Sequence, residues 1–160
     1  MKTKNEVSIF IIDDSQVCID MYSIALNRLG YSNIKTFLKS ADCLNSLVLS
    51  PKIVFLDYNM DDLNGIEILK KIKRFDPHIL VVFISSQEQI NVAVNALKYG
   101  AFDYIAKKDF NIERVKLVME KLESVREIID RRNKKSVMSK VLSTVGLFSL
   151  SLIVKDSFPK

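Results

Sequence analysis

Short apolar runs alternate with longer amphipathic segments along the first 130 residues of this 160-residue chain. Runs rich in β-branched and aromatic residues predict buried strands at 7–12, 34–37, 53–56, 80–84 and 102–106. Apolar residues at helical spacing predict helices at 16–29, 40–49, 66–75, 87–99 and from 112 onward. Strands that alternate with helices form βαβ units. The predicted fold is therefore α/β: a doubly wound, five-stranded parallel sheet flanked by five helices, over residues 5–130.

Individual residues mark the ends and the buried face of the first predicted helix. Ser15 is suited to cap the helix, and Gly30 is suited to end it. The apolar residues that recur at helical spacing predict the face that packs on the sheet, namely Val17, Met21, Ile24 and Leu29. We therefore expect these side chains to be buried.

The positive charge of the chain is concentrated at its carboxyl end. The chain has a formal net charge of +5, with 24 Lys and Arg against 19 Asp and Glu. Residues 131–160 hold seven of the basic residues and one of the acidic ones, which makes this segment +6 and leaves residues 1–130 at −1. The net positive charge of the chain thus comes from residues 131–160 and not from a basic surface of the domain. No nucleic-acid partner is therefore expected.

The sequence also restricts the expected cellular compartment of the protein and the kinds of metal site that it could form. The amino terminus lacks the pattern of a signal peptide because its apolar run is short and ends in two aspartates, so a cytoplasmic location is expected. Cys18 and Cys43 form no CxxC pair and are predicted to be small core residues. With His78 the single histidine, predicted in a surface turn, a structural zinc site is not expected.

Polar residues follow four of the predicted strands at the point where each strand ends. These are Asp13 and Asp14, then Asp57, Ser85 and Lys107. In an open parallel sheet, ligands bind beyond the carboxyl ends of the strands. Three converging carboxylates repel one another unless a cation such as Mg²⁺ joins them, and a hydroxyl and an ammonium suit the outer oxygens of a phosphoryl group. The pattern predicts a carboxylate that is phosphorylated beside Mg²⁺, with Asp57 as the nucleophile because it stands alone on its strand.

Taken one at a time, the same residues have ordinary structural explanations. The aspartate pair is also typical of an Asx turn or a helix cap, Ser85 of a helix cap, and Lys107 of a solvated surface lysine. The joint occurrence of all four groups at successive strand ends favours the functional interpretation.

Four stretches of the chain resemble the receiver domain of two-component response regulators. They are FIIDDS (10–15), VFLDYNMDDLNGIEIL (54–69), VVFISSQ (81–87) and GAFDYIAKKDF (100–110). The resemblance implies a flavodoxin-like fold in which Asp57 accepts a phosphoryl group from a histidine kinase or a phosphotransfer protein. It further implies a phosphoacceptor rather than an enzyme, with at most slow self-dephosphorylation.

The resemblance also implies a set of metal ligands. Asp14 and Asp57 would bind Mg²⁺ directly, together with the backbone carbonyl of Asn59. Asp13 would act largely through water.

Roles in switching follow from the same resemblance. Ser85 and Lys107 would bind the phosphoryl oxygens, and Tyr104 stands where the family carries its switch aromatic, although ordinary packing also explains a tyrosine there. Two positions depart from the family, since Asp61 and Lys108 replace the usual prolines. Asp61 adds negative charge near the metal loop, and the peptide bond before Lys108 is expected to be trans.

Three other classes of protein fit the sequence less well. A receiver-like binding module that works without phosphorylation would not need Asp14, Asp57, Ser85 and Lys107, which are all present. A phosphohydrolase of the haloacid dehalogenase type also uses an aspartate nucleophile with Mg²⁺. Its motif, however, lies near the first strand, and here Asn59 takes the place of its second aspartate. A dinucleotide-binding role fails because no GxGxxG follows the first strand.

The segment 131–160 forms an appendage with no pattern of a DNA-binding output domain. Its basic start precedes fourteen uncharged residues at 141–154, fewer than the roughly 20 apolar residues of a spanning helix. Four alternatives stay open for this segment: contact with an anionic membrane through residues 131–155, packing on another subunit, disorder, or a strand. In the strand, Phe148, Leu150, Leu152 and Val154 would alternate with serines. Without an effector domain, the surface of residues 87–130 is expected to bind a downstream protein or to dimerise.

Overall fold

The structure, a computed structural model, describes residues 4–61, 63–86 and 90–155, without the side chains of residues 90, 133 and 142–155. The five strands are β1 (Ile9–Ile12), β2 (Ile34–Phe37), β3 (Ile53–Asp57), β4 (Leu80–Ser85) and β5 (Asp103–Ala106). They pair in parallel in the order β2-β1-β3-β4-β5. This order confirms the predicted doubly wound parallel sheet.

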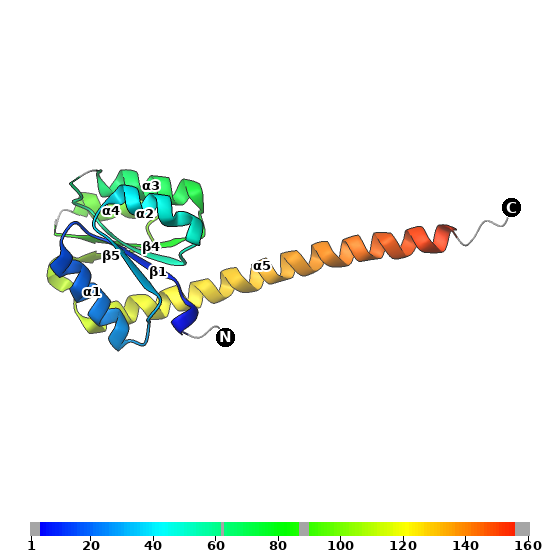
Figure 1. The fold of residues 1–160 in the computed structure, drawn as a ribbon, viewed down its shortest axis with the longest axis horizontal. Helices are drawn as coiled ribbons and strands as arrows, with labels where there is room; N and C mark the ends of the chain where they lie inside the picture. Colours follow the sequence, from blue (N-terminus) through cyan, green and yellow to red (C-terminus); the bar gives the residue numbers. More distant parts are fainter. Residues whose placement is uncertain (1–3, 62, 87–89, 156–160) are drawn as a thin grey trace. The chain divides into compact units, whose positions relative to one another are not determined.

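Five helices connect and follow these strands. They are α1 (Gln16–Arg28), α2 (Ser40–Asn45), α3 (Gly65–Phe75), α4 (Ile90–Lys98) and α5 (Ile112–Lys155), with short 3₁₀ turns at Lys4–Glu6, Ser46–Leu49 and Lys107–Asp109. In Figure 1, α2, α3 and α4 cover one face of the sheet, while α1 and the first turns of α5 cover the other. The predicted second helix ends early, because its last residues form the 3₁₀ turn Ser46–Leu49.

Burial explains why the central strands read as continuous apolar runs. Every residue of β1, β3 and β4 is buried, as expected for strands covered on both faces. On one face, β1, β3 and β4 pack with α2, α3 and α4 in a cluster that includes Phe10, Leu56, Ile68, Phe83 and Ala96. The sheet is therefore held from both sides, which fixes the positions of its strand ends.

The face of α1 that packs on the sheet differs from the predicted one. Val17, Met21 and Ile24 are exposed by 78%, 40% and 54%, and Leu29 lies at the helix end, half-buried. The buried side chains are instead Ile19, Tyr22, Ala25 and Leu26. Both sets recur at helical spacing, so periodicity alone does not decide which one faces the sheet. The structure selects the set that includes a tyrosine.

The ends of α1 agree with the prediction. Ser15 has an extended backbone before the helix, and its hydroxyl accepts a hydrogen bond from the backbone N–H of Cys18 at 3.5 Å. Gly30 follows the helix with a φ of 90°, a left-handed conformation that favours glycine. The two cysteines differ, since Cys43 is buried as predicted while Cys18 is only half-buried.

Helix α5 continues to Lys155, and the chain divides into two compact units, Met1–Leu122 and Glu123–Lys160. The strand alternative for the segment around residues 148–154 is therefore wrong. A helix satisfies its own backbone hydrogen bonds, whereas a strand needs a neighbouring strand. The predicted domain boundary at residue 130 stays a prediction.

None of the helices in the described part of the chain is both long enough and apolar enough to cross a membrane.

Candidate functional site

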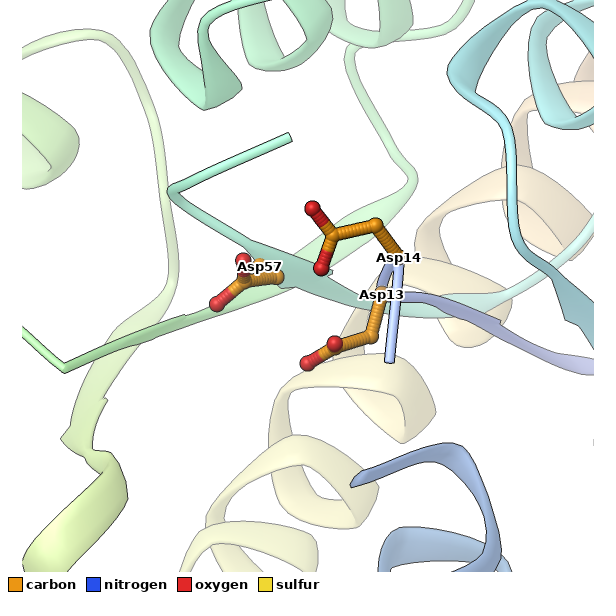
Figure 2. Close-up of side chains that lie close together, drawn as sticks. All are labelled: Asp13, Asp14 and Asp57. Atoms are coloured by element: carbon orange, nitrogen blue, oxygen red, sulfur yellow. The ribbon is translucent and has the colours of Figure 1, made fainter. Parts of the chain in front are cut away.

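The register of the sheet brings three carboxylates to one edge. Asp57 is the last residue of β3, where it pairs with Ile84 of β4. Ile12, the last residue of β1, pairs with Leu56, so Asp13 and Asp14 leave β1 beside Asp57. One carboxylate oxygen from each of the three aspartates lies within 4.8 Å of the other two (Figure 2). The structure thus assembles the acidic cluster that the strand ends predict.

Asp57 is a buried carboxylate whose charge is met by one ammonium. Its side chain is 1% exposed, and neither Oδ1 nor Oδ2 accepts a hydrogen bond from any described residue. The ammonium of Lys107 lies 2.9 Å from Oδ1, an ion pair outside hydrogen-bonding angles. Burial raises the pKa of Asp57 to about 6, and the adjacent ammonium keeps the pKa from rising further.

Asp13, by contrast, is surrounded by donors. Its Oδ1 accepts the backbone N–H of Ser15 at 2.9 Å. Its Oδ2 accepts hydrogen bonds from the Lys107 ammonium at 2.9 Å and from the Tyr22 hydroxyl at 3.3 Å. This carboxylate is fully buried, so each donor replaces water that the group has lost.

Lys107 is shared between the two buried carboxylates. Its ammonium contacts Asp13 and Asp57, each at 2.9 Å, and the thiol of Cys18 at 3.7 Å. Burial alone would lower the pKa of Lys107, but the two carboxylates outweigh burial and raise this pKa above its usual value. The lysine therefore keeps its charge.

Asp14 stands at the exposed rim of the cluster. Partial desolvation, and then the negative charges of Asp61 and Asp13, raise the pKa of Asp14. The negative charge of Asp61, which replaces the usual proline, is thus near enough to act on Asp14, and its effect on metal binding stays a prediction.

The donor set fits Mg²⁺. Three carboxylates meet one ammonium, and both oxygens of Asp57 lack a hydrogen bond from any described residue. A hard divalent cation takes oxygen ligands of this kind. That Mg²⁺ is bound here, and that the Asn59 carbonyl joins it, stay predictions.

The loop after Asp57 folds back against that residue. Asn59 bridges to Asn64, and Gly65 donates its N–H to the Tyr58 carbonyl at 3.0 Å. A Cβ at Gly65 would lie only 2.7 Å from the Asp57 carbonyl oxygen and 2.8 Å from Tyr58 Cα. Only glycine permits this close approach, so Gly65 helps to fix the loop that carries the predicted Asn59 ligand.

Ser85 and Tyr104 occupy the predicted strand positions. Ser85 is the buried last residue of β4; it follows Ile84, the partner of Asp57, and pairs with Ala106, which precedes Lys107. Tyr104 on β5 is half-buried and packs against the apolar cluster on the α4 side of the sheet. The register places both residues on the strands that end at the site, and their roles stay predictions.

Sequence reasoning missed two side chains of α1. Cys18 and Tyr22 are one helical turn apart, and they contact Lys107 and Asp13 respectively. Tyr22 lies nine residues after Asp13, within the buried face of α1. A tyrosine in an otherwise apolar stripe was the signal that could have revealed it, because a buried hydroxyl needs a partner.

The peptide bond before Lys108 is trans as expected, since the described residues contain no cis peptide bond.

Comparison with known proteins supports one family. The family model of the response regulator receiver domain matches residues 9–120. The transcriptional regulatory protein TdiR of Thauera aromatica is 24% identical over 155 residues, covering 96% of this chain and 68% of TdiR. The nitrogen assimilation regulatory protein NtrX of Azorhizobium caulinodans is 35% identical over 122 residues, covering 74% of this chain and 26% of NtrX.

A solved structure agrees with the sequence comparisons. The BeF₃-activated receiver domain of DrrB superimposes with a TM-score of 0.62 at 32% identity, covering 71% of this chain and 97% of that domain. This chain spans only 29% and 30% of two further relatives, NtrC of Proteus hauseri and an NtrX-like regulator of Rickettsia bellii.

Proposed function

This chain belongs to the response regulator receiver domain family, and we propose that it accepts a phosphoryl group on Asp57 from a histidine kinase or a phosphotransfer protein. The buried Asp57 carboxylate carries this proposal, because neither of its oxygens accepts a hydrogen bond from a described residue. A carboxylate oxygen that accepts no hydrogen bond is a competent nucleophile for phosphorus.

The transfer needs few protein groups. An Asp57 oxygen attacks the phosphorus of a phosphohistidine, a P–O bond forms, the P–N bond breaks, and its electron pair returns to the imidazole. Asp14 and Asp57 would hold Mg²⁺ with the Asn59 carbonyl, and Asp13 would act through water. When bound, Mg²⁺ supplies positive charge that offsets the carboxylates and the phosphoryl oxygens.

Lys107 would couple this chemistry to a change of surface. Its ammonium bridges Asp13 and Asp57 at 2.9 Å each, so a phosphoryl group on Asp57 offers it a stronger anionic partner. Together with Ser85, the lysine would bind phosphoryl oxygens and draw the β5 end toward Asp57. Tyr104 and the surface of residues 87–130, of which 87–89 lie outside the described residues, would then bind a downstream protein or a second copy.

The test uses a small phosphodonor. The protein is incubated with acetyl phosphate and Mg²⁺, and intact mass spectrometry should show the gain of one phosphoryl group. Asp57→Asn and removal of Mg²⁺ by a chelator should each abolish the gain. The matched control is Asp20→Asn, the same change at an exposed residue of α1. An undiminished gain in Asp57→Asn would overturn the assignment.

The same preparation separates the alternatives. Catalytic turnover of a phosphate monoester would favour the phosphohydrolase interpretation over a phosphoacceptor with slow self-dephosphorylation. An unmodified wild-type protein at saturating donor and Mg²⁺ would favour a phosphorylation-independent module.

We further propose that the helical segment of residues 131–155 contacts an anionic membrane surface. Residues 131–140 hold five Lys and Arg residues and no acidic residue. The apolar Val137, Met138 and Val141 on the same segment are exposed by 60%, 62% and 52%. The full chain should therefore pellet with vesicles that contain an anionic lipid, whereas a chain ending at Asp130 should not. Equal behaviour of the two chains would refute this contact.

A further inference from the structure

Tyr22 enters the site from α1 and touches it at two places. Its side chain is 1% exposed, and its hydroxyl donates to Asp13 Oδ2 at 3.3 Å. Its ring packs on Phe110, with centroids 4.6 Å apart and ring planes at 50°. Phe110 directly follows the 3₁₀ turn that Lys107 begins, and its N–H donates to the Lys107 carbonyl at 3.3 Å. Tyr22 thus contacts both an acidic residue of the cluster and the segment that carries the lysine.

The hydroxyl reaches Asp13 as a donor. A phenol has a single O–H, and at 3.3 Å that O–H is directed to Asp13 Oδ2.

The two donors to Asp13 Oδ2, Lys107 and Tyr22, are expected to respond differently to phosphorylation of Asp57. Lys107 also faces Asp57 and is the group that the proposed phosphorylation would redirect. Once the ammonium turns to the phosphoryl oxygens, Asp13 Oδ2 loses its charged donor while it is still fully buried. Tyr22 donates to Asp13 and also interacts with Cys18, one turn earlier on the same helix, so no contact of this hydroxyl depends on Asp57 or on a phosphoryl group there.

We propose that Tyr22 is a positioning residue of the site: its hydroxyl holds the buried Asp13 carboxylate when the Lys107 ammonium turns to a phosphoryl group on Asp57. The proposal rests on the phosphoacceptor function proposed above. It explains why a hydroxyl is tolerated within the buried face of α1, where a leucine would fill the space without any need for a polar partner. It also predicts a selective effect: loss of the hydroxyl should penalise the phosphoryl-bound state more than the free state, in which Lys107 still serves Asp13.

The experiment replaces Tyr22 by phenylalanine, which keeps the ring on Phe110 and removes one oxygen atom. Beryllofluoride, a mimic of the phosphoryl group, is titrated at saturating Mg²⁺ into ¹⁵N-labelled full-length protein and followed by amide NMR shifts. Tyr22→Phe should bind beryllofluoride on the order of tenfold more weakly than wild type. The matched control is Tyr31→Phe, which removes a hydroxyl from an equally buried tyrosine and should bind within twofold of wild type.

The outcomes separate this inference from the function on which it rests. If wild type does not bind beryllofluoride, the phosphoacceptor proposal fails. If wild type binds and Tyr22→Phe binds equally well, only the role of Tyr22 fails. Equal weakening in both tyrosine variants would indicate a general loss of stability and would also refute the positioning role.

A second measurement does not depend on any variant. In wild-type protein with ¹³Cζ-labelled tyrosine, the Tyr22 resonance should shift when beryllofluoride binds, because its hydroxyl becomes the remaining side-chain donor to Asp13 Oδ2. The Tyr31 resonance serves as the internal reference. A Tyr22 resonance that moves no more than that of Tyr31 would contradict the inference.

Discussion

Replacing Asp57 by asparagine should make the metal-free protein more stable at neutral and alkaline pH. The reason is the burial of the carboxylate, which is 1% exposed and accepts no hydrogen bond from the described residues. Its pKa rises from 3.8 to about 6 on folding. Above pH 6 the folded protein must therefore hold a charge that the unfolded chain accommodates more easily.

The magnitude follows from that shift. A pKa raised from 3.8 to about 6 makes the ionised carboxylate unfavourable by about 3 kcal/mol. The asparagine amide removes this penalty but leaves buried polar atoms short of partners, which costs about 1–2 kcal/mol. The net expectation is that Asp57→Asn raises the free energy of unfolding by about 1–2 kcal/mol.

The sign of the pH dependence is fixed by the direction of the shift. Because the folded-state pKa is higher than the unfolded one, the folded state binds more protons between pH 3.8 and about 6. The penalty is fully present above pH 6 and disappears as the pH falls toward 3.8. The difference in the free energy of unfolding should accordingly favour Asp57→Asn near pH 8 and should reverse to favour wild type by about 1–2 kcal/mol below pH 3.8, where only the cost of the asparagine amide remains.

Urea unfolding followed by tyrosine fluorescence measures this difference. The chain has five tyrosines and no tryptophan, and all five tyrosines lie within the unit Met1–Leu122. The fluorescence therefore reports on that unit without a contribution from the carboxyl-terminal helix. Asp20→Asn, at an exposed residue, is the control and should show no such pH dependence.

Mg²⁺ supplies the decisive comparison. At 100 times its dissociation constant, a ligand that binds only the folded state adds about 2.7 kcal/mol to stability. Mg²⁺ should stabilise wild type by such an amount and Asp57→Asn by much less, so that the difference between them closes or reverses. A variant that is less stable than wild type at pH 8 without Mg²⁺, or a difference that does not change with pH, would refute the reasoning.

Three further substitutions test other parts of the structure. Gly65→Ala should lower the free energy of unfolding by about 1–3 kcal/mol, because its Cβ would lie 2.7 Å from the Asp57 carbonyl oxygen; unchanged urea unfolding would contradict the close approach. Ser15→Ala should lower the same quantity by about 0.5–1 kcal/mol through loss of the cap to Cys18, whereas a neutral result would show that the 3.5 Å contact adds nothing. Lys107→Ala should still accept a phosphoryl group from acetyl phosphate but show smaller phosphorylation-dependent NMR shifts in residues 90–106; shifts equal to those of wild type would exclude its coupling role.

The sheet and the acidic cluster could be predicted because topology leaves little freedom. Parallel strands place their carboxyl ends at one edge, so residues that directly follow β1 and β3 must meet. The positions of Asp13 and Asp57 could be predicted without knowing how any helix is rotated about its axis. The position of Lys107 could be predicted from the residue at which β5 ends.

The contribution of α1 could not be predicted for the opposite reason. This helix carries apolar residues on more than one face, and the exposed Val17, Met21 and Ile24 fit a helical stripe as well as the buried set. Choosing the wrong stripe turns Tyr22 away from the sheet and hides its contact with Asp13. Packing against neighbouring elements decides the rotation, and hydrophobic spacing does not contain that information.

The segment 131–160 shows a similar limit of prediction from local sequence. Serines alternate with apolar residues near residues 148–154, which is compatible with a strand when the local pattern is read alone. The structure continues α5 through this segment to Lys155. The deciding factor is where backbone hydrogen bonds go, since a strand without a neighbour leaves its donors and acceptors unpaired.

The charge balance of the cluster links metal binding to switching. Asp13, Asp14 and Asp57 present three carboxylates, and the Lys107 ammonium is the cation that the structure pairs with the two buried ones. A phosphoryl group on Asp57 adds negative charge at a point where water is excluded, so the added charge must be met by a divalent cation or by the lysine. If Mg²⁺ offsets most of this added negative charge, Lys107 does not have to neutralise the charge. The lysine can then move from Asp13 to the phosphoryl oxygens. If Lys107 leaves Asp13, the Tyr22 hydroxyl is the remaining side-chain donor to Asp13 Oδ2, and under our proposal α1 then takes part in the switch.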